Sequence, residues 1–124
     1  MPARTVVSCA LSLALAAGAQ AHHPGSHARR EGDGRVRLEV VAAVADSCTA
    51  VADVRPGTPP GVVAPPGSMP VTAGLRRDGG PCVPRAAAIR SEHVLEAGAN
   101  VRQVHLYILS PEGALAATER VPVR

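Results

Sequence analysis

Residues 36–44 read VRLEVVAAV, and this stretch decides the fold class. Arg37 and Glu39 fall on one side of an extended chain, whereas the apolar members share the other side: Val36, Leu38, Val40, Ala42 and Val44. A period of two with β-branched residues is typical of a strand that buries one face. The sequence therefore predicts a strand that begins at Val36 and ends near Asp46.

Strand-like patterns continue on the C-terminal side of this stretch and are interrupted by turn signals. Apolar or alternating segments occur at residues 50–54, 71–75, 86–95, 101–109 and 114–123. Only the short segment 96–100 separates the third from the fourth, so we expect these two to pair as a hairpin. Pro122 lacks a backbone N–H, so we expect the last strand to lie at a sheet edge or to direct this position outward.

Strands at this spacing, with little helical periodicity, predict an all-β fold: a small antiparallel β-sandwich of immunoglobulin-like type with one disulfide. A helix is the alternative for residues 84–95, because the alanines, arginines and glutamate there have good helix propensity. Residues 55–68 are rich in proline and glycine, and we interpret them as a loop that connects the two sheets.

The chain of 124 residues has room for one small domain. We expect a signal peptide at residues 1–21, a mobile histidine-containing arm at residues 22–35 and a single β-sandwich domain at residues 36–124. The leader combines Arg4, an apolar run and small residues before an expected cleavage site after Ala21. No segment has the roughly 20 apolar residues of a transmembrane helix. The expected location is therefore periplasmic or secreted.

The cysteines point to a structural disulfide. Cys9 lies in the expected signal peptide, which leaves Cys48 and Cys82. In an oxidising compartment, two cysteines of a small domain most simply form one bond, with a free thiol or an intermolecular bond as the alternative. A redox role is not indicated, because the two lie far apart in the sequence and form no C-x-x-C motif.

Charge and aromatic content argue against nucleic acid as a partner. Thirteen basic residues face ten acidic ones. The basic residues are dispersed singly or in pairs such as Arg29-Arg30, without the cluster that tracks phosphates. Tyr107 is the only Phe, Trp or Tyr residue, whereas single-strand binders stack bases on several aromatic rings.

The sequence contains no catalytic signature. Ser47 and Ser91 lie outside a G-x-S-x-G turn, which would expose a nucleophile beside a base. Glu92, Glu96 and Glu112 form no pair suited to acid–base chemistry. No glycine-rich phosphate loop lies between a strand and a helix. We therefore expect no enzymatic activity.

The histidines form a candidate metal site. His22, His23 and His27 lie near the expected mature N-terminus, where an α-amine and imidazoles suit Cu(II), Ni(II) or Zn(II). The expected hairpin makes His93 and His105 diagonal neighbours, which adds two further candidate ligands. A β-sandwich with an N-terminal histidine resembles the general plan of small periplasmic copper carriers. Methionine clusters are missing, since the mature part has Met69 alone.

Two functions therefore remain open. The first is a non-catalytic exported domain that acts as a binding or accessory module for another envelope or secreted protein, without a cofactor. Such a module would dock through an unpaired strand edge, and residues 121–123 and the strand from Val36 are the candidate edges. The alternative is a periplasmic protein that binds or carries copper, or else Ni or Zn, through its N-terminal histidines.

Overall fold

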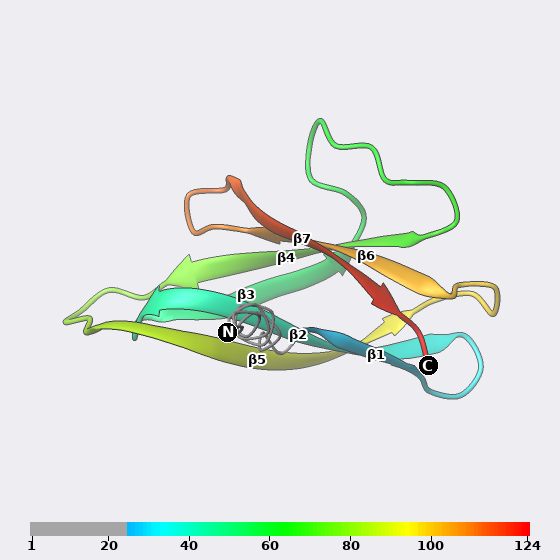
Figure 1. Ribbon diagram of the computed structural model, residues 1–124, viewed down its shortest axis with the longest axis horizontal. Helices are drawn as coiled ribbons and strands as arrows, with labels where there is room; N and C mark the ends of the chain where they lie inside the picture. The colour runs from blue at the N-terminus through cyan, green and yellow to red at the C-terminus, as the bar shows by residue number, and fades with distance from the viewer. Residues whose placement is uncertain (1–24) are drawn as a thin grey trace, which may run out of the picture.

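A computed structural model describes residues 25–124 as seven strands in two facing sheets (Figure 1). The expected signal peptide at residues 1–21 and the candidate ligands His22 and His23 lie outside these residues. The strands are β1 (His27–Arg30), β2 (Arg35–Asp46), β3 (Thr49–Pro56), β4 (Met69–Arg77), β5 (Pro84–Glu96), β6 (Gln103–Leu109) and β7 (Leu115–Pro122). The predicted all-β, sandwich-like fold with one disulfide is confirmed.

The two sheets differ in strand direction. The three-stranded sheet has the order β1-β2-β5 and is antiparallel throughout. The four-stranded sheet has the order β3-β4-β6-β7, and its central pair, β4 and β6, is parallel. The prediction of an exclusively antiparallel sandwich is therefore wrong for this pair. The reason is that β5, which runs back along the other sheet, separates β4 from β6 in the chain, so the two run in the same direction.

The expected hairpin of residues 86–95 with residues 101–109 does not form. β5 pairs with β2, where Leu38 lies opposite His93, whereas β6 lies in the other sheet between β4 and β7. The short connection between them crosses from one sheet to the other. The alternative of a helix at residues 84–95 is also wrong, because pairing with the long strand β2 overrides the local helix propensity.

The N-terminal arm contains a strand. Residues 27–30, expected to belong to a mobile arm that extends to residue 35, form β1 and pair with residues 36–39 of β2. Arg30 fixes β1 further, since its guanidinium donates to the carbonyl oxygens of Ala97, Gly98 and Val101 at 3.1, 3.1 and 2.7 Å. One planar guanidinium thereby ties β1 to the chain that leaves β5.

The core between the sheets is aliphatic, since the chain has neither Phe nor Trp. The alternation quoted from β2 supplies one side of this core. Its largest fully buried side chains come from both sheets: Leu38, Leu106, Val36, Val40, Val71, Val104 and Val121. At one end the sheets are joined, because Ala28 forms a parallel bridge with Val123 and the Arg124 N–H donates to the Ala28 carbonyl at 3.0 Å.

The proline-rich loop lies over the outer face of the four-stranded sheet (Figure 1). It connects β3 to β4, which are neighbours in that sheet, so the expected role as a connector between sheets is wrong. The loop begins at Gly57, whose φ of 115° favours glycine. The Gly57 carbonyl accepts a hydrogen bond from the Thr72 hydroxyl at 2.8 Å. Tyr107 lies on the outer face of this sheet, on the same side as the loop, and is only 3% exposed.

Candidate functional site

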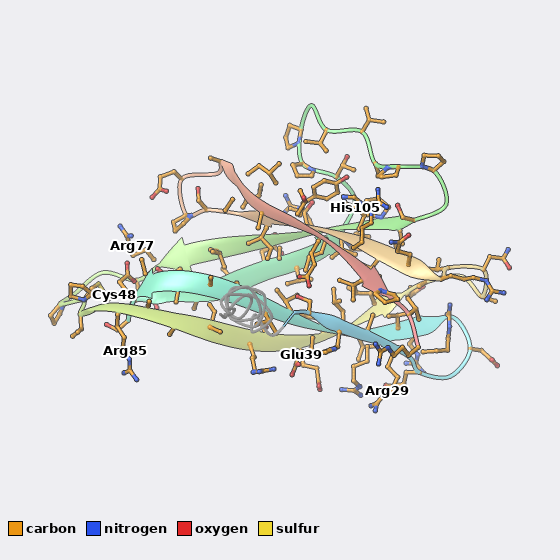
Figure 2. All side chains as sticks on the ribbon, in the orientation of Figure 1. Arg29, Glu39, Cys48, Arg77, Arg85 and His105 are labelled. Atoms are coloured by element: carbon orange, nitrogen blue, oxygen red, sulfur yellow. A yellow bond between two sulfur atoms is a disulfide. The ribbon has the colours of Figure 1, made fainter. Side chains whose placement is uncertain are left out.

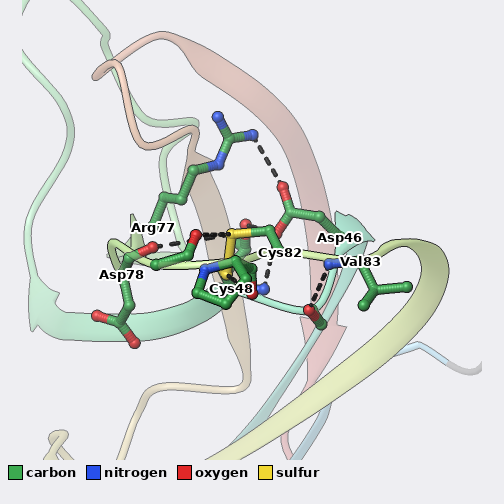
Figure 3. The surroundings of a disulfide bond; sticks show 10 residues. Asp46, Cys48, Arg77, Asp78, Cys82 and Val83 are labelled. Atoms are coloured by element: carbon green, nitrogen blue, oxygen red, sulfur yellow. Dashed lines mark hydrogen bonds and ion pairs between the residues drawn. A yellow bond between two sulfur atoms is a disulfide. The ribbon is translucent and has the colours of Figure 1, made fainter.

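The disulfide joins two turns that lie at the same end of the sandwich (Figure 3). Cys48 follows β2 and Cys82 precedes β5, and their Cα atoms are 5.5 Å apart. The predicted pairing is confirmed. Backbone contacts hold the same turns, because the Ser47 N–H donates to the Val83 carbonyl at 3.0 Å and the Val83 N–H donates to the Ser47 hydroxyl at 2.9 Å.

Asp46 supports the turn that carries Cys48. Its Oδ1 accepts hydrogen bonds from the Thr49 hydroxyl and the Cys48 N–H, both at 2.9 Å. Its Oδ2 lies 2.9 Å from Arg77 Nη2 (Figure 3). The hydrogen bonds from Thr49 and Cys48, together with the Arg77 charge, lower the pKa of the Asp46 carboxyl. The ionised form of Asp46 therefore stabilises this end of the sandwich.

The histidines of the described residues lie apart from one another. His27 is exposed on β1 opposite Glu39, and His93 lies on β5 opposite Leu38. His105 lies on β6 in the other sheet, so the expected contact between His93 and His105 does not form. Figure 2 shows His105 on the side of the molecule opposite to Glu39. Residues 25–124 contain no group of three or more His, Cys, Asp or Glu side chains that could hold a metal ion.

His105 packs against the single tyrosine. The His105 and Tyr107 rings are tilted by 31° with centroids 4.8 Å apart. The Nδ1 atom of His105 is buried and makes no hydrogen bond with the described part of the chain. Both residues lie on β6 and are separated by two positions, which directs their side chains to the same face of the sheet.

Ser91 and His93 form a contact that the sequence did not predict. Both side chains point toward the space between the sheets, because their partners on β2, Val40 and Leu38, are fully buried. The Ser91 hydroxyl lies 2.5 Å from His93 Nε2. The two residues are separated by two positions on one strand, which places their side chains on the same face, and this spacing could have indicated the contact. Within residues 25–124 no hydrogen bond joins His93 to a carboxylate that would orient the ring as in a triad.

The outer face of the three-stranded sheet is covered by paired charges. Arg37 contacts Glu31 and also Glu92, the latter at 2.6 Å, and Arg90 contacts Glu39 at 3.1 Å. The hydrogen bond from Arg37 lowers the pKa of Glu31. A hollow of about 300 Å³ on this face brings His27 and Arg29 beside these pairs, near Arg124.

A larger groove opens between the two sheets. Its volume is about 470 Å³, and its walls are mostly small or aliphatic side chains. We call it the β2–β7 groove, because it is lined by residues 41–43 of β2, residues 116–119 of β7, Leu75, Ile108, Gly25 and Ala88. Among residues 25–124, Glu119 is the only charged residue that lines it, and the Glu119 carboxylate accepts a hydrogen bond from the Ser26 N–H at 2.9 Å.

One wall of this groove is a strand edge. β1 pairs only with residues 36–39, so β2 continues past the end of β1. The Val41 N–H donates to the Ser26 hydroxyl at 3.0 Å on the β1 side. Because alternate residues of a strand direct their backbone groups to the same side, the N–H and C=O of Ala43 also point away from β5. Within residues 25–124, the groove therefore combines apolar side chains with backbone groups at Ala43 that have no strand partner on this side.

No protein-family model, curated protein or solved structure matches the chain. Across residues 25–124, no helix has the length and apolar character needed to cross a bilayer.

The two edges favoured by the sequence are largely occupied. The strand from Val36 is the central strand of its sheet, with β1 on one side and β5 on the other. β7 is an edge strand, as Pro122 predicted, but the Val123 N–H donates to the Arg102 carbonyl at 2.9 Å and Val123 bridges to Ala28. Among residues 25–124, the unpaired part of this β2 edge begins only at Ala43, because Ser26 occupies the Val41 N–H.

Proposed function

We propose that the protein is a non-catalytic, exported binding module, which docks an extended segment of another envelope or secreted protein in the β2–β7 groove. The observation that carries this proposal is the edge of β2 at Ala43, which no other part of residues 25–124 pairs with, beside an apolar groove. Strand addition uses both parts, because the edge supplies backbone hydrogen bonds and the groove receives alternate side chains. The disulfide supports export, since such bonds persist in oxidising compartments.

The lining of the groove indicates the chemistry of the docked segment. Ala42, Ala117 and Gly25 leave room between the sheets, while Leu75 and Ile108 provide apolar contact. The docked segment should therefore be extended, with branched apolar side chains at every second position. Glu119 favours a basic group at the end of the groove near Gly25.

We also propose that the sandwich is of immunoglobulin-like type. Two facing sheets with seven strands and a buried aliphatic core support it. The parallel β4–β6 pair is the feature that departs from a purely antiparallel sandwich.

The test is binding of a synthetic peptide in which valine and threonine alternate, with a single lysine at its N-terminus. We expect a Kd tighter than about 1 mM by calorimetry and slower hydrogen exchange of the Ala43 amide on binding. Ala43→Pro should weaken binding at least about tenfold, because it removes the outward N–H but not a β2–β5 hydrogen bond. Ala43→Ser keeps this N–H and serves as the matched control.

A second pair of variants tests the groove rather than the edge. Ala117→Phe should block the peptide by filling the groove, whereas Ala114→Phe places the same ring in the exposed turn before β7 and should leave binding unchanged. Equal binding by the Ala43→Pro and Ala43→Ser variants would contradict strand addition. Equal binding by the two phenylalanine variants would contradict the groove as the site.

Copper binding remains the alternative function and depends on His22 and His23, which lie outside the described residues. The test is titration of the exported protein with Cu(II) against a competing chelator. Stoichiometric binding tighter than about micromolar, lost in His22→Ala or His23→Ala, would favour the metal function. Weak binding that survives both substitutions would contradict it.

A further inference from the structure

No strand of residues 25–124 pairs with the outer edge of β5, which lies on the opposite side of the three-stranded sheet from the β2–β7 groove. β5 is the last strand of this sheet. The Val41 backbone faces away from β5, so its partner Arg90 must face away from β2. The Ala97 N–H, an odd-numbered neighbour, donates to the Gly34 carbonyl on the β2 side at 2.8 Å, which agrees with this alternation. The backbone groups of the even-numbered residues therefore line the outer edge: Ala88, Arg90, Glu92 and Val94.

The side chains of these residues lie together on the outer face of the sheet. Their partners on β2 include Arg37 and Glu39, which face away from the core. Arg90 and Glu92 have side chains that are 52% and 54% exposed. Val94 is 43% exposed, which is high for a large aliphatic residue in a strand. The edge thus presents a positive, a negative and an apolar side chain in a fixed order.

We propose that this edge binds a second copy of the same chain, with the two β5 strands antiparallel about a two-fold axis at Ser91. Residues that are equally far from the axis lie opposite each other in such a pair. Arg90 of each copy then faces Glu92 of the other, and Ala88 of each copy faces Val94 of the other. Directly opposite side chains lie about 4.5–5.5 Å apart at Cβ, close enough for both kinds of contact. The N–H and C=O groups of Arg90 and Glu92 exchange hydrogen bonds across the axis.

Charge complementarity selects this register over its neighbours. An axis at Arg90 places two arginines opposite each other, and an axis at Glu92 does the same with two glutamates. An axis at Ala88 or Ile89 leaves both charges opposite Ala86 or another uncharged residue. An axis at His93 places Arg90 opposite Glu96, but it leaves Glu92 opposite Val94 without a cation. Only the axis at Ser91 pairs Arg90 with Glu92 and also places Val94 opposite an apolar residue. The pairing converts two three-stranded sheets into one sheet of six strands and removes both β5 edges from solvent.

The test is sedimentation equilibrium of the full exported protein and of single charge-reversal variants. We expect the wild-type protein to dimerise. Arg90→Glu and Glu92→Arg should each weaken the dimer at least about tenfold, because each places two like-charge pairs across the axis. An equimolar mixture of the two variants should dimerise to within about threefold of wild type, since every pair across a mixed dimer is again of opposite charge.

Matched variants separate the dimer contact from the contacts within one copy. Glu39→Gln removes the partner of Arg90 within its own sheet and should leave the dimer intact. Ala88→Pro removes an outward N–H and should weaken the dimer without unfolding the chain. A wild-type protein that remains monomeric up to about 1 mM, or a mixture that fails to dimerise, would overturn the proposal. The proposal does not depend on the β2–β7 groove, and Ala43→Pro should leave the dimer unchanged.

Discussion

Removal of the Cys48–Cys82 bond should cost a large share of the stability of this domain. The bond closes a sequence separation of 34 residues, for which the chain-entropy model gives about 3.8 kcal/mol at 25 °C. A domain of this size has a free energy of unfolding of about 5–15 kcal/mol in total. We therefore expect the Cys48→Ser/Cys82→Ser double variant to fold, with its free energy of unfolding reduced by about 3–4 kcal/mol.

The structure indicates that this loss of stability comes from the greater conformational freedom of the unfolded chain and not from a change in the folded turns. The hydrogen bonds between Ser47 and Val83, and from the Asp78 N–H to the Cys48 carbonyl at 2.9 Å, do not involve the sulfur atoms. The native turns should therefore persist without the bond. The unfolded chain, by contrast, gains freedom and exposes more surface, so the urea m-value should increase.

Urea unfolding followed by circular dichroism measures both quantities. The reduced wild-type protein is the matched control, because it lacks the bond but keeps both sulfur atoms. Agreement between the reduced protein and the double variant would assign the loss to the cross-link. A loss below about 1 kcal/mol with an unchanged m-value would refute the reasoning, because it would mean that the bond does not restrict the unfolded chain.

Three further predictions concern the fold. Leu38→Ala should lower the free energy of unfolding by about 3–5 kcal/mol in urea titrations, because Leu38 is fully buried, whereas Ala43→Ser on the exposed face should change it by less than about 0.5 kcal/mol. Arg30→Met should lower the free energy of unfolding by about 1.5–3 kcal/mol in the same assay. Arg30→Lys should lower it as well, since one ammonium does not reproduce the planar contact with three carbonyls, and wild-type stability of the lysine variant would contradict this role. Asp46 has a pKa in the folded protein below its unfolded value of about 3.9, so its carboxylate stabilises the fold above that pH and loses this effect as the pH falls through the folded pKa. The free energy of unfolding should therefore decrease more between pH 7 and pH 3 in the wild type than in Asp46→Asn, and equal decreases would exclude Asp46 as a contributor.

The sequence predicted features that depend on local pattern. The alternation at residues 36–44 gave β2 and its buried face, because a period of two directly sets which side chains enter the core. The disulfide followed from the cysteine count. The exposed edge position of β7 followed from Pro122, since proline cannot donate in the interior of a sheet.

Features that depend on which strands pair were not predicted. The hairpin was inferred from a short connection, but that connection crosses between the sheets, and β5 finds its partner in β2. β1 was missed because Ala28 is the only member of this short strand that is buried. The β2–β7 groove depends on where β1 ends. Because β1 has no apolar periodicity, its end could not be predicted from the sequence.

The position of Tyr107 has a practical consequence for spectroscopy. The chain has no tryptophan and no other tyrosine, so Tyr107 accounts for its near-ultraviolet fluorescence. The ring is buried on the side of the four-stranded sheet that carries the loop between β3 and β4, and it stacks on His105. Emission from this single ring should therefore report on the loop and the imidazole beside it, with no contribution from elsewhere in the molecule. The native chain carries its own optical probe, and no label needs to be introduced.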